Sequence, residues 1–255
     1  MSTTIDLDGV HTWYEVYGQG EPLVALHPGG VDARALRPNV KALSEHFQVF
    51  TPERRGHGHT PDVPGPITHE QMAQDTILFL DRVVRGPARL VGVSDGAVVA
   101  LLVALARPDL VERLVCAAGV FHRDGWLPQA IDPNAEIPQF IVSMYGEVSP
   151  DGVEHFPIVA KKLADTHQRS PALAPADLGK ISARTLVMIG DDDQVTLEHA
   201  LQFYRALPRG ELAIVPGTSH GLLVEKTELC NRILLEFLLQ EPVETRAPIR
   251  RLISN

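Results

Sequence analysis

Short apolar runs alternate with helix-length segments along most of this 255-residue chain. Runs such as 22–27 and 113–118 are almost continuously apolar, which is typical of strands buried on both faces of a sheet. The predicted strands are 11–18, 22–27, 48–52, 89–93, 113–118, 185–189 and 212–215, and the predicted helices are 33–46, 69–85, 96–106, 196–206 and one ending near 239. This alternation predicts an α/β fold in which a mostly parallel central sheet has helices on both faces.

The interval 121–183 breaks this alternation. It contains prolines at 128, 133, 138, 150, 157, 171 and 175, which permit only short helices. Its apolar residues need a surface to cover, so we expect an inserted helical lid rather than disorder. Substrate-binding side chains are expected among its aromatic and methionine residues, namely Trp126, Phe140, Met144 and Tyr145. The predicted organisation is a core of 1–120 and 184–240, a lid of 121–183 and a loosely held tail of 241–255.

Charge and composition limit the classes of partner that the protein is expected to bind. The net charge of −9 argues against nucleic acid, because phosphate binding needs a basic surface. The first ten residues lack the pattern of a secretory signal, and the longest apolar stretch, 97–106, is too short to cross a bilayer. Cys116 and Cys230 show no metal-ligand spacing and are expected to be free core thiols. We therefore expect a cytoplasmic protein with a small-molecule substrate and no cofactor; the oligomeric state is left open.

The stretch "GVSDG", residues 92–96, places a serine between two glycines. A strand ends at Val93 and a helix opens at Asp95 or Gly96, so the turn between them must be very tight. Such a turn strains the backbone of Ser94 and presents its hydroxyl at the carboxyl edge of the sheet. It also points the Asp95 N–H, at a helix N-terminus, toward the place where an oxyanion would form. Ser94 is the candidate nucleophile.

A serine nucleophile needs a base and a carboxylate that orients it. His220, in "IVPGTSHG", follows the last predicted strand, and loops at that end of a parallel sheet meet at one edge. Three carboxylates, Asp191, Asp192 and Asp193, follow the preceding strand. The residues alone leave the choice among the three open. The order serine, aspartate, histidine is that of an α/β-hydrolase.

The chain resembles the α/β-hydrolase fold superfamily from about residue 10 to 240, specifically its single-lid esterase-like group. The matching motifs are "LHPGG" (26–30), "ERRGHGHT" (53–60), "GVSDG" (92–96), "GDDD" (190–193) and "GTSH" (217–220). The resemblance implies a central sheet of about eight strands. It also implies that Asp193 is the acid of a catalytic triad with Ser94 and His220.

The resemblance further implies an oxyanion hole made by the N–H groups of Asp95 and Gly29, with Gly30 as the alternative donor. Two residues depart from the family pattern. Pro28 stands where glycine is usual, which stiffens the loop. No proline follows the acid; Thr196 is expected to cap the next helix instead.

Four other histidines have competing interpretations. His27 is expected to order the oxyanion loop. His57 and His59 look like a metal-binding pair, but a glycine-rich structural loop is favoured because no cluster of further ligands accompanies them. His122, near the start of the lid, fits a pocket wall and a solvated loop equally well. No metal site is therefore predicted.

These residues predict a serine hydrolase, of the carboxylesterase type, that cleaves an ester or lactone of a small to medium, partly apolar substrate. A non-hydrolytic ligand-binding protein with this fold is one alternative. Haloperoxidase-like perhydrolysis or C–C bond cleavage by the same triad is another. Asp95 carries a further hypothesis, that its carboxylate meets a substrate amine; the alternative is that it merely suits a helix N-terminus.

Overall fold

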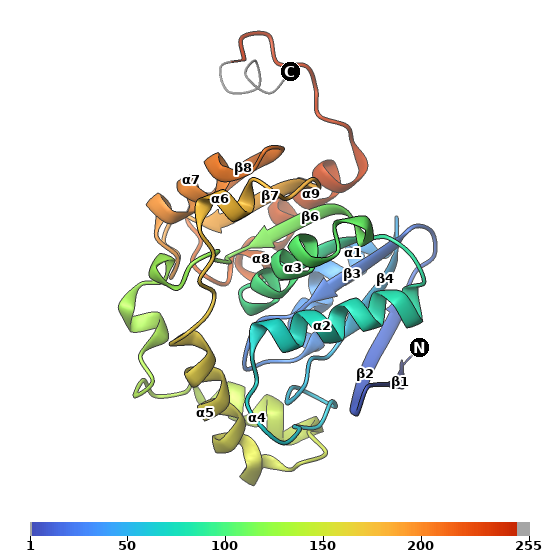
Figure 1. The fold of residues 1–255 in the computed structure, drawn as a ribbon, viewed down its shortest axis with the longest axis vertical. Coiled ribbons are helices and arrows are strands. Elements are labelled where there is room, and N and C mark those ends of the chain that lie inside the picture. The colour runs from blue at the N-terminus through green and yellow to red at the C-terminus, as the bar shows by residue number, and fades with distance from the viewer. Residues whose placement is uncertain (1, 249–255) are drawn as a thin grey trace.

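Eight strands form a single sheet in the computed structural model, which describes residues 2–248 (Figure 1). The strands are β1 (Ser2–Leu7), β2 (Val10–Tyr17), β3 (Pro22–Leu26), β4 (Gln48–Pro52), β5 (Ala88–Val93), β6 (Val111–Ala117), β7 (Arg184–Gly190) and β8 (Gly210–Val215). Their order in the sheet is β1-β2-β4-β3-β5-β6-β7-β8. The pairs β1–β2 and β2–β4 are antiparallel. The remaining neighbours, β4–β3, β3–β5, β5–β6, β6–β7 and β7–β8, are parallel. The predicted α/β class and the mostly parallel sheet are confirmed.

Helices cover both faces of this sheet. They are α1 (Arg37–Leu43), α2 (His69–Phe79), α3 (Asp95–Ala106), α4 (Gln139–Val148), α5 (Phe156–His167), α6 (Pro175–Leu178), α7 (Leu197–Ala206), α8 (Leu222–Glu225) and α9 (Thr227–Leu239). Buried side chains of α2, α3 and α7 share one apolar cluster, and those of α1, α8 and α9 share another with the opposite sheet face. Two layers of helix therefore enclose the sheet, as parallel crossovers require.

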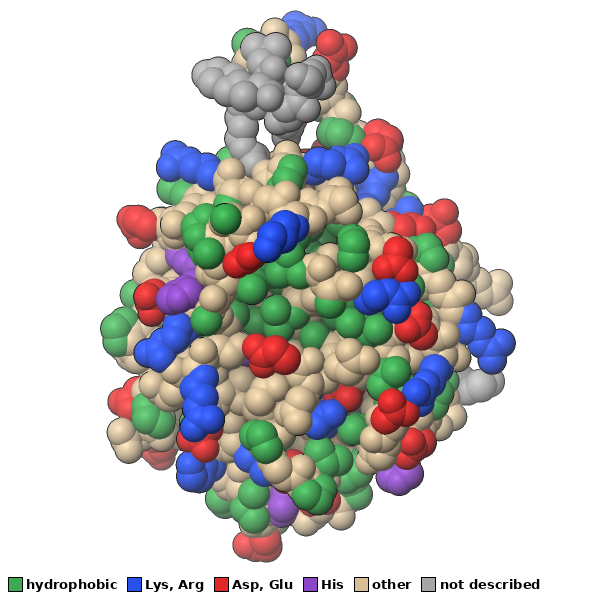
Figure 2. Space-filling view, in the orientation of Figure 1, with side chains coloured by type: hydrophobic (Ala, Val, Ile, Leu, Met, Phe, Trp, Pro, Cys, Tyr) green, Lys and Arg blue, Asp and Glu red, His purple; other side chains and the backbone are tan. Residues whose placement is uncertain are grey.

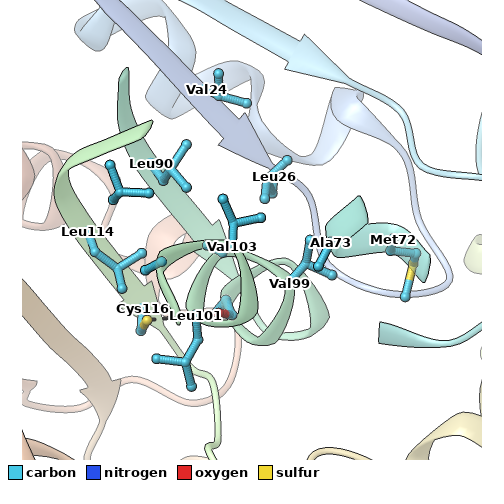
Figure 3. Packing of buried hydrophobic residues seen from close by; sticks show 14 of the residues in the cluster. Val24, Leu26, Met72, Ala73, Leu90, Val99, Leu101, Val103, Leu114 and Cys116 are labelled. Carbon is cyan, nitrogen blue, oxygen red and sulfur yellow. Dashed lines mark hydrogen bonds between the residues drawn. The ribbon is translucent and has the colours of Figure 1, made fainter. Parts of the chain in front are cut away.

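Helix α3 lies at the centre of the first layer. It is apolar on every side, which is typical of a helix with no solvent-facing stripe. Figure 3 shows Val99, Leu101 and Val103 of this helix among side chains of the sheet, including Leu26 and Leu90. These side chains are buried, and each large one contributes roughly 1.5–3 kcal/mol by leaving water. The packing fixes the end of β5 and the start of α3, where Ser94 lies.

The structure corrects three local expectations. Residues 2–7, for which no strand was predicted, form β1, an edge strand whose mostly exposed sequence carries little apolar signal. The predicted helix 33–46 is a 3₁₀ turn at Ala33–Leu36 followed by the short α1. The predicted helix 69–85 is α-helical only to Phe79 and continues as a π-helical turn to Val84.

The chain between β6 and β7 carries α4, α5 and α6 (Figure 1). Helices α4 and α5 lie together at the lower end of the view, whereas the sheet occupies the middle. At the other end of the chain, residues 241–248 form no helix or strand, and the rest of the predicted tail, 249–255, lies outside the described residues. In the described part of the chain, no helix combines the length and apolar character needed to cross a bilayer.

The face shown in Figure 2 mixes Lys and Arg side chains with Asp and Glu side chains, around apolar ones near its centre. No single basic patch dominates this face.

Candidate active site

Ser94 occupies the turn between β5 and α3. Its backbone angles, φ 55° and ψ −120°, lie in a region that residues other than glycine rarely adopt. The Ser94 N–H donates to the carbonyl of Ala117 at 2.8 Å, and its carbonyl accepts from the N–H of Ala97 at 2.9 Å. The backbone is therefore held in a strained conformation while the hydroxyl makes no capping bond to its own helix.

The two glycines that flank Ser94 are required by close packing. A Cβ at Gly92 would overlap the backbone of Gly96, and a Cβ at Gly96 would overlap the carbonyl of Leu26 at the end of β3. A side chain at either position would push β5, α3 or β3 apart. The tight turn inferred from the sequence is thus explained by contacts between neighbouring backbones.

The structure brings Ser94, His220 and Asp193 together. His220 Nε2 lies 3.0 Å from Ser94 Oγ, and His220 Nδ1 lies 2.8 Å from Asp193 Oδ1. The Asp193 carboxylate is fully buried and also accepts from the N–H groups of Gly190 and Val195, both at 3.1 Å. A histidine between a buried carboxylate and a serine hydroxyl has the geometry of a general base that is oriented by its acid.

Asp193 is the one of three adjacent aspartates that reaches His220. Asp191 Oδ1 instead accepts from the N–H of Thr218 at 3.1 Å, and the Asp192 N–H donates to the carbonyl of Thr218. Asp191 and Asp192 are both exposed. Together they tie the loop after β7 to the loop that carries His220. The predicted cap of α7 is confirmed, because Thr196 Oγ1 accepts from the N–H of His199 at 3.3 Å.

Trp126, one of the residues predicted to bind substrate, contacts a residue of the triad. Its ring contacts the His220 ring edge-on, with 5.5 Å between ring centroids. It also lines an open cleft of about 800 Å³ with Leu127, Ile131 and Gln168. A second cavity, of about 630 Å³, is lined by Phe121, His122 and His199, among others. His122 therefore does line a cavity, but one formed between the segment that follows β6, residues 172–175 and the start of α7.

The other three predicted binding residues lie on α4, in different surroundings. Phe140 is 60% exposed, whereas Tyr145 is buried against Phe156. The carbonyl of Met144 accepts a hydrogen bond from Arg34 at 2.6 Å. A residue that the sequence did not single out, Ile141, lies beside Gly30 of the oxyanion loop: a Cβ at Gly30 would be 3.6 Å from it. Its helical periodicity was the only available signal.

The predicted oxyanion loop, residues 27–30, is held by hydrogen bonds that involve His27 and Arg54. His27 is completely buried; its Nε2 accepts from the N–H of Arg54 at 3.2 Å, and its Nδ1 donates to the carbonyl of Pro28 at 2.7 Å. Arg54 Nη2 also donates to the carbonyl of Pro28, at 2.9 Å. Burial and the neighbouring Arg54 charge hold the pKa of His27 well below its ordinary value. These bonds are those of a neutral imidazole that fixes the loop.

His57 and His59 have separate structural partners. His57 Nδ1 donates to the carbonyl of Arg55 at 2.9 Å, and burial lowers the pKa of its buried ring to about 4. His59 stacks on Trp13, with 4.1 Å between ring centroids, and contacts Glu53 at 3.0 Å. Neither belongs to a group of three possible metal ligands within the described chain. Each ring therefore makes its own contacts within the loop, and the two do not form a shared site.

Asp95 has side-chain partners that the sequence did not reveal. His167 Nε2 lies 2.8 Å from Oδ1 and 3.0 Å from Oδ2, and His69 Nε2 lies 3.3 Å from Oδ1. Burial opposes ionisation of the carboxyl, but His167 and His69 hold the pKa of Asp95 well below its usual range. The Asp95 charge outweighs burial and raises the pKa of His167. We name these three residues the Asp95 cluster.

The Asp95 cluster bears on two hypotheses. Within residues 2–248 it is the one group of three possible metal-ligating side chains whose donor atoms lie within 4.8 Å of one another. Both imidazole Nε2 atoms are already at hydrogen-bond distance from the carboxylate, so protein groups alone account for the arrangement. The hypothesis that Asp95 meets a substrate amine is not supported, because its side chain is 3% exposed and both oxygens contact histidine.

Comparison with known proteins identifies relatives that match most of the chain. A family model described as the alpha/beta hydrolase family matches residues 23–232. The (E)-2-((N-methylformamido)methylene)succinate hydrolase of Acinetobacter baylyi is 31% identical over 95% of this chain and all of its own length. A putative carbamate hydrolase, RutD, of Caulobacter segnis is 27% identical over 92% of this chain and 98% of its own.

Solved structures show the same fold. The enol-lactonase from Burkholderia xenovorans LB400 superposes with a TM-score of 0.76 at 21% identity, covering 93% of this chain and all of the lactonase chain. At that sequence identity, the structural similarity supports the same fold but not the same activity. The family model and the Acinetobacter relative go further, because each spans most of the chain. The chain belongs to the alpha/beta hydrolase family.

Proposed function

We propose that the protein is a serine hydrolase that cleaves a carboxylic ester or lactone through an acyl-enzyme intermediate. Ser94 is the nucleophile, His220 the base and Asp193 the acid that orients it. The N–H groups of Asp95 and Gly29 form the oxyanion hole. The single observation that carries the proposal is the continuous contact from Asp193 to His220 to Ser94, at 2.8 and 3.0 Å.

The first half-reaction follows from these contacts. As Ser94 Oγ forms a bond to the acyl carbon, its proton passes to His220 Nε2, and the carbonyl oxygen becomes an oxyanion. Asp193 stabilises the resulting imidazolium through Nδ1–H. The tetrahedral intermediate then collapses: the oxyanion becomes a carbonyl oxygen again, the C–O bond to the alcohol breaks, and the leaving alcohol takes the proton from His220.

The second half-reaction returns the enzyme to its starting state. Water takes the place of the alcohol, and His220 accepts one of its protons as its oxygen attacks the acyl carbon. When the tetrahedral intermediate collapses, the acid leaves and Ser94 Oγ regains the proton. The exposed quarter of the His220 side chain gives water access to this position.

We assign the core to residues 1–120 and 184–240, the lid to 121–183 and a tail to 241–255. The contacts of the lid with the site support this division: Trp126 packs on His220, and Ile141 lies beside Gly30. The cleft beside Trp126, of about 800 Å³, is lined by apolar and polar residues. Such a cleft suits a small to medium, partly apolar substrate.

A second candidate is hydrolysis of an amide-like or carbamate C–N bond by the same residues. The names of the Acinetobacter hydrolase and of the RutD proteins support it, since the chain matches most of their length. The chemistry differs only in the leaving group, which would take the His220 proton as an amine. Ester and C–N substrates must therefore be compared directly.

The test is a panel of p-nitrophenyl esters, lactones, carbamates and N-acyl enamines, with Ser94→Ala as the control. The proposal expects kcat/KM to be highest on an ester or lactone and all turnover to disappear in Ser94→Ala. Turnover of carbamates or enamides alone would favour the second candidate. Failure of a fluorophosphonate to label Ser94 would contradict both and favour a ligand-binding protein.

A further inference from the structure

Asp95 contributes to the site twice. Its N–H, in the first turn of α3, is one of the two proposed oxyanion donors, because the first amides of a helix have no acceptor within the helix. Its side chain turns away from solvent and is 3% exposed. The same residue therefore joins the site to a group of buried side chains on other elements.

The carboxylate of Asp95 lies against Gly29, whose N–H is the second proposed oxyanion donor. A Cβ at Gly29 would lie 2.8 Å from Asp95 Cγ and would overlap the carboxylate oxygen. Only a glycine lets the oxyanion loop approach the carboxylate so closely. From the other side, Arg54 Nη2 donates to the carbonyl of Pro28 at 2.9 Å. The position of Gly29 thus depends on where the Asp95 carboxylate is held.

Two histidines from separate elements hold that carboxylate. His69 is the first residue of α2, and His167 is the last residue of α5, within the segment between β6 and β7. Both contact it through Nε2, at 3.3 and 2.8 Å. His69 Nδ1 lies 3.0 Å from the hydroxyl of Ser170, three residues beyond His167. The Asp95 cluster therefore ties the end of α5 to the turn that carries Ser94.

We propose that Asp95 is a positioning residue whose carboxylate, held by His69 and His167, fixes the oxyanion loop at Gly29 and docks the end of α5 onto the Ser94 turn. This inference rests on the proposed function. The Asp95 carboxylate acts on the reaction by positioning Gly29, and it does not touch the substrate itself. Its loss displaces an oxyanion donor, which lowers kcat while leaving ground-state binding nearly unchanged.

His167 provides the sharpest test, since its side chain is partly exposed and its removal leaves α3 intact. His167→Ala removes the contact to Asp95. His167→Gln keeps an N–H donor near the position of Nε2. We expect kcat on p-nitrophenyl butyrate to fall about 10- to 100-fold in His167→Ala, with KM within about threefold of wild type. We expect His167→Gln to recover kcat to within about threefold.

His155→Ala is the matched control. It lies beside α5 in the same segment, is similarly exposed, and contacts a carboxylate, Asp62, at 2.9 Å. If general loosening of the segment were responsible, His155→Ala would lower kcat as much as His167→Ala. The inference expects it to match wild type. Thermal unfolding of each variant shows that the compared proteins are folded.

Several results would overturn the inference. They are a kcat within twofold of wild type in His167→Ala, a loss confined to KM, an equal loss in His155→Ala, or no recovery in His167→Gln. One metal ion per wild-type chain, lost in His167→Ala, would also overturn it. Normal fluorophosphonate labelling of Ser94 with unchanged kcat in every variant refutes this inference alone. No labelling of the wild type refutes the proposed function as well.

Discussion

Two histidine–carboxylate groups lie near Ser94, and they are built differently. In one, the buried Asp193 accepts two backbone N–H groups and one histidine, His220, whose far nitrogen faces the serine hydroxyl. In the other, Asp95 accepts two histidines, His69 and His167, each through Nε2. The bond lengths to carboxylate are alike, at 2.8 Å for both His220 and His167.

The comparison teaches that a close imidazole–carboxylate pair does not by itself identify a catalytic base. What distinguishes His220 is the direction of its second nitrogen, toward a strained serine at a helix N-terminus. In the Asp95 cluster both imidazoles turn their Nε2 atoms inward to the carboxylate. In the proposed mechanism the first group moves a proton during the reaction, whereas the second holds the loop at Gly29.

The largest expected effect separates the two histidines. His220→Ala removes the base and should lower kcat by about 10⁵- to 10⁶-fold on a p-nitrophenyl ester, since a triad without its histidine retains little beyond binding and the oxyanion hole. The loss in His167→Ala should be several orders of magnitude smaller. Steady-state kinetics of the two purified variants checks this. Losses of equal size would break the distinction between base and positioning residue.

The carboxylates provide the next comparison. Asp193→Asn preserves the shape of the side chain but favours the wrong tautomer of His220, so kcat should fall by about 10⁴-fold. Asp191→Asn is the control, because the Asp191 carboxylate bonds to the backbone of the loop at Gly217 and Thr218 rather than to His220. It should stay within about threefold of wild type. A larger loss in Asp191→Asn than in Asp193→Asn would show that the acid is misassigned.

The oxyanion loop gives a smaller effect. Gly29→Ala places a methyl group against the Asp95 carboxylate and should displace the loop, which lowers kcat by about 100-fold. Gly86→Ala is the control, because a Cβ there meets nothing within 4 Å. Rapid kinetics of acylation measures the change. Unchanged acylation in Gly29→Ala would mean that Gly29 is not an oxyanion donor and that Gly30 should be tested.

Histidines whose ring nitrogens bond to backbone are expected to affect the stability of the fold and not the rate of the reaction. Burial lowers the pKa of His57 and of His199 to about 4, so the folded protein favours their neutral forms. Their stabilisation is complete above pH 6.5 and is lost as the pH falls toward 4, by up to roughly 3 kcal/mol for each. Urea unfolding at pH 7.0 and 4.5 measures the loss. In His199→Gln it should be smaller than in wild type; an equal loss would contradict the assignment.

The sequence predicted one of the two groups and missed the other for a physical reason. Ser94, Asp193 and His220 follow β5, β7 and β8, and the carboxyl ends of parallel strands meet at one edge, so linear order implied proximity. His69 and His167 lie in helical segments about a hundred residues apart, in no motif. Only the docking of α2 and α5 on α3 brings them to Asp95.

The fold, like the site, has parts that the sequence predicted and parts that it did not. The buried strands were predictable from continuous apolar runs, because a parallel sheet covered on both faces leaves them no polar side. The edge strand β1 was not, since its exposed residues "STTIDL" give no clear alternation. Phe140 was expected to bind substrate from composition, yet it is largely exposed on α4. Composition indicated an apolar insertion but not which side chains face inward.

The most direct test of the central claim is the site and rate of modification by a fluorophosphonate, measured by peptide mass spectrometry in wild type and in His220→Ala. The account predicts a single adduct on Ser94 that forms rapidly in wild type and at least about 1000-fold more slowly without the histidine. An adduct on another residue, or equal rates in the two proteins, would contradict it.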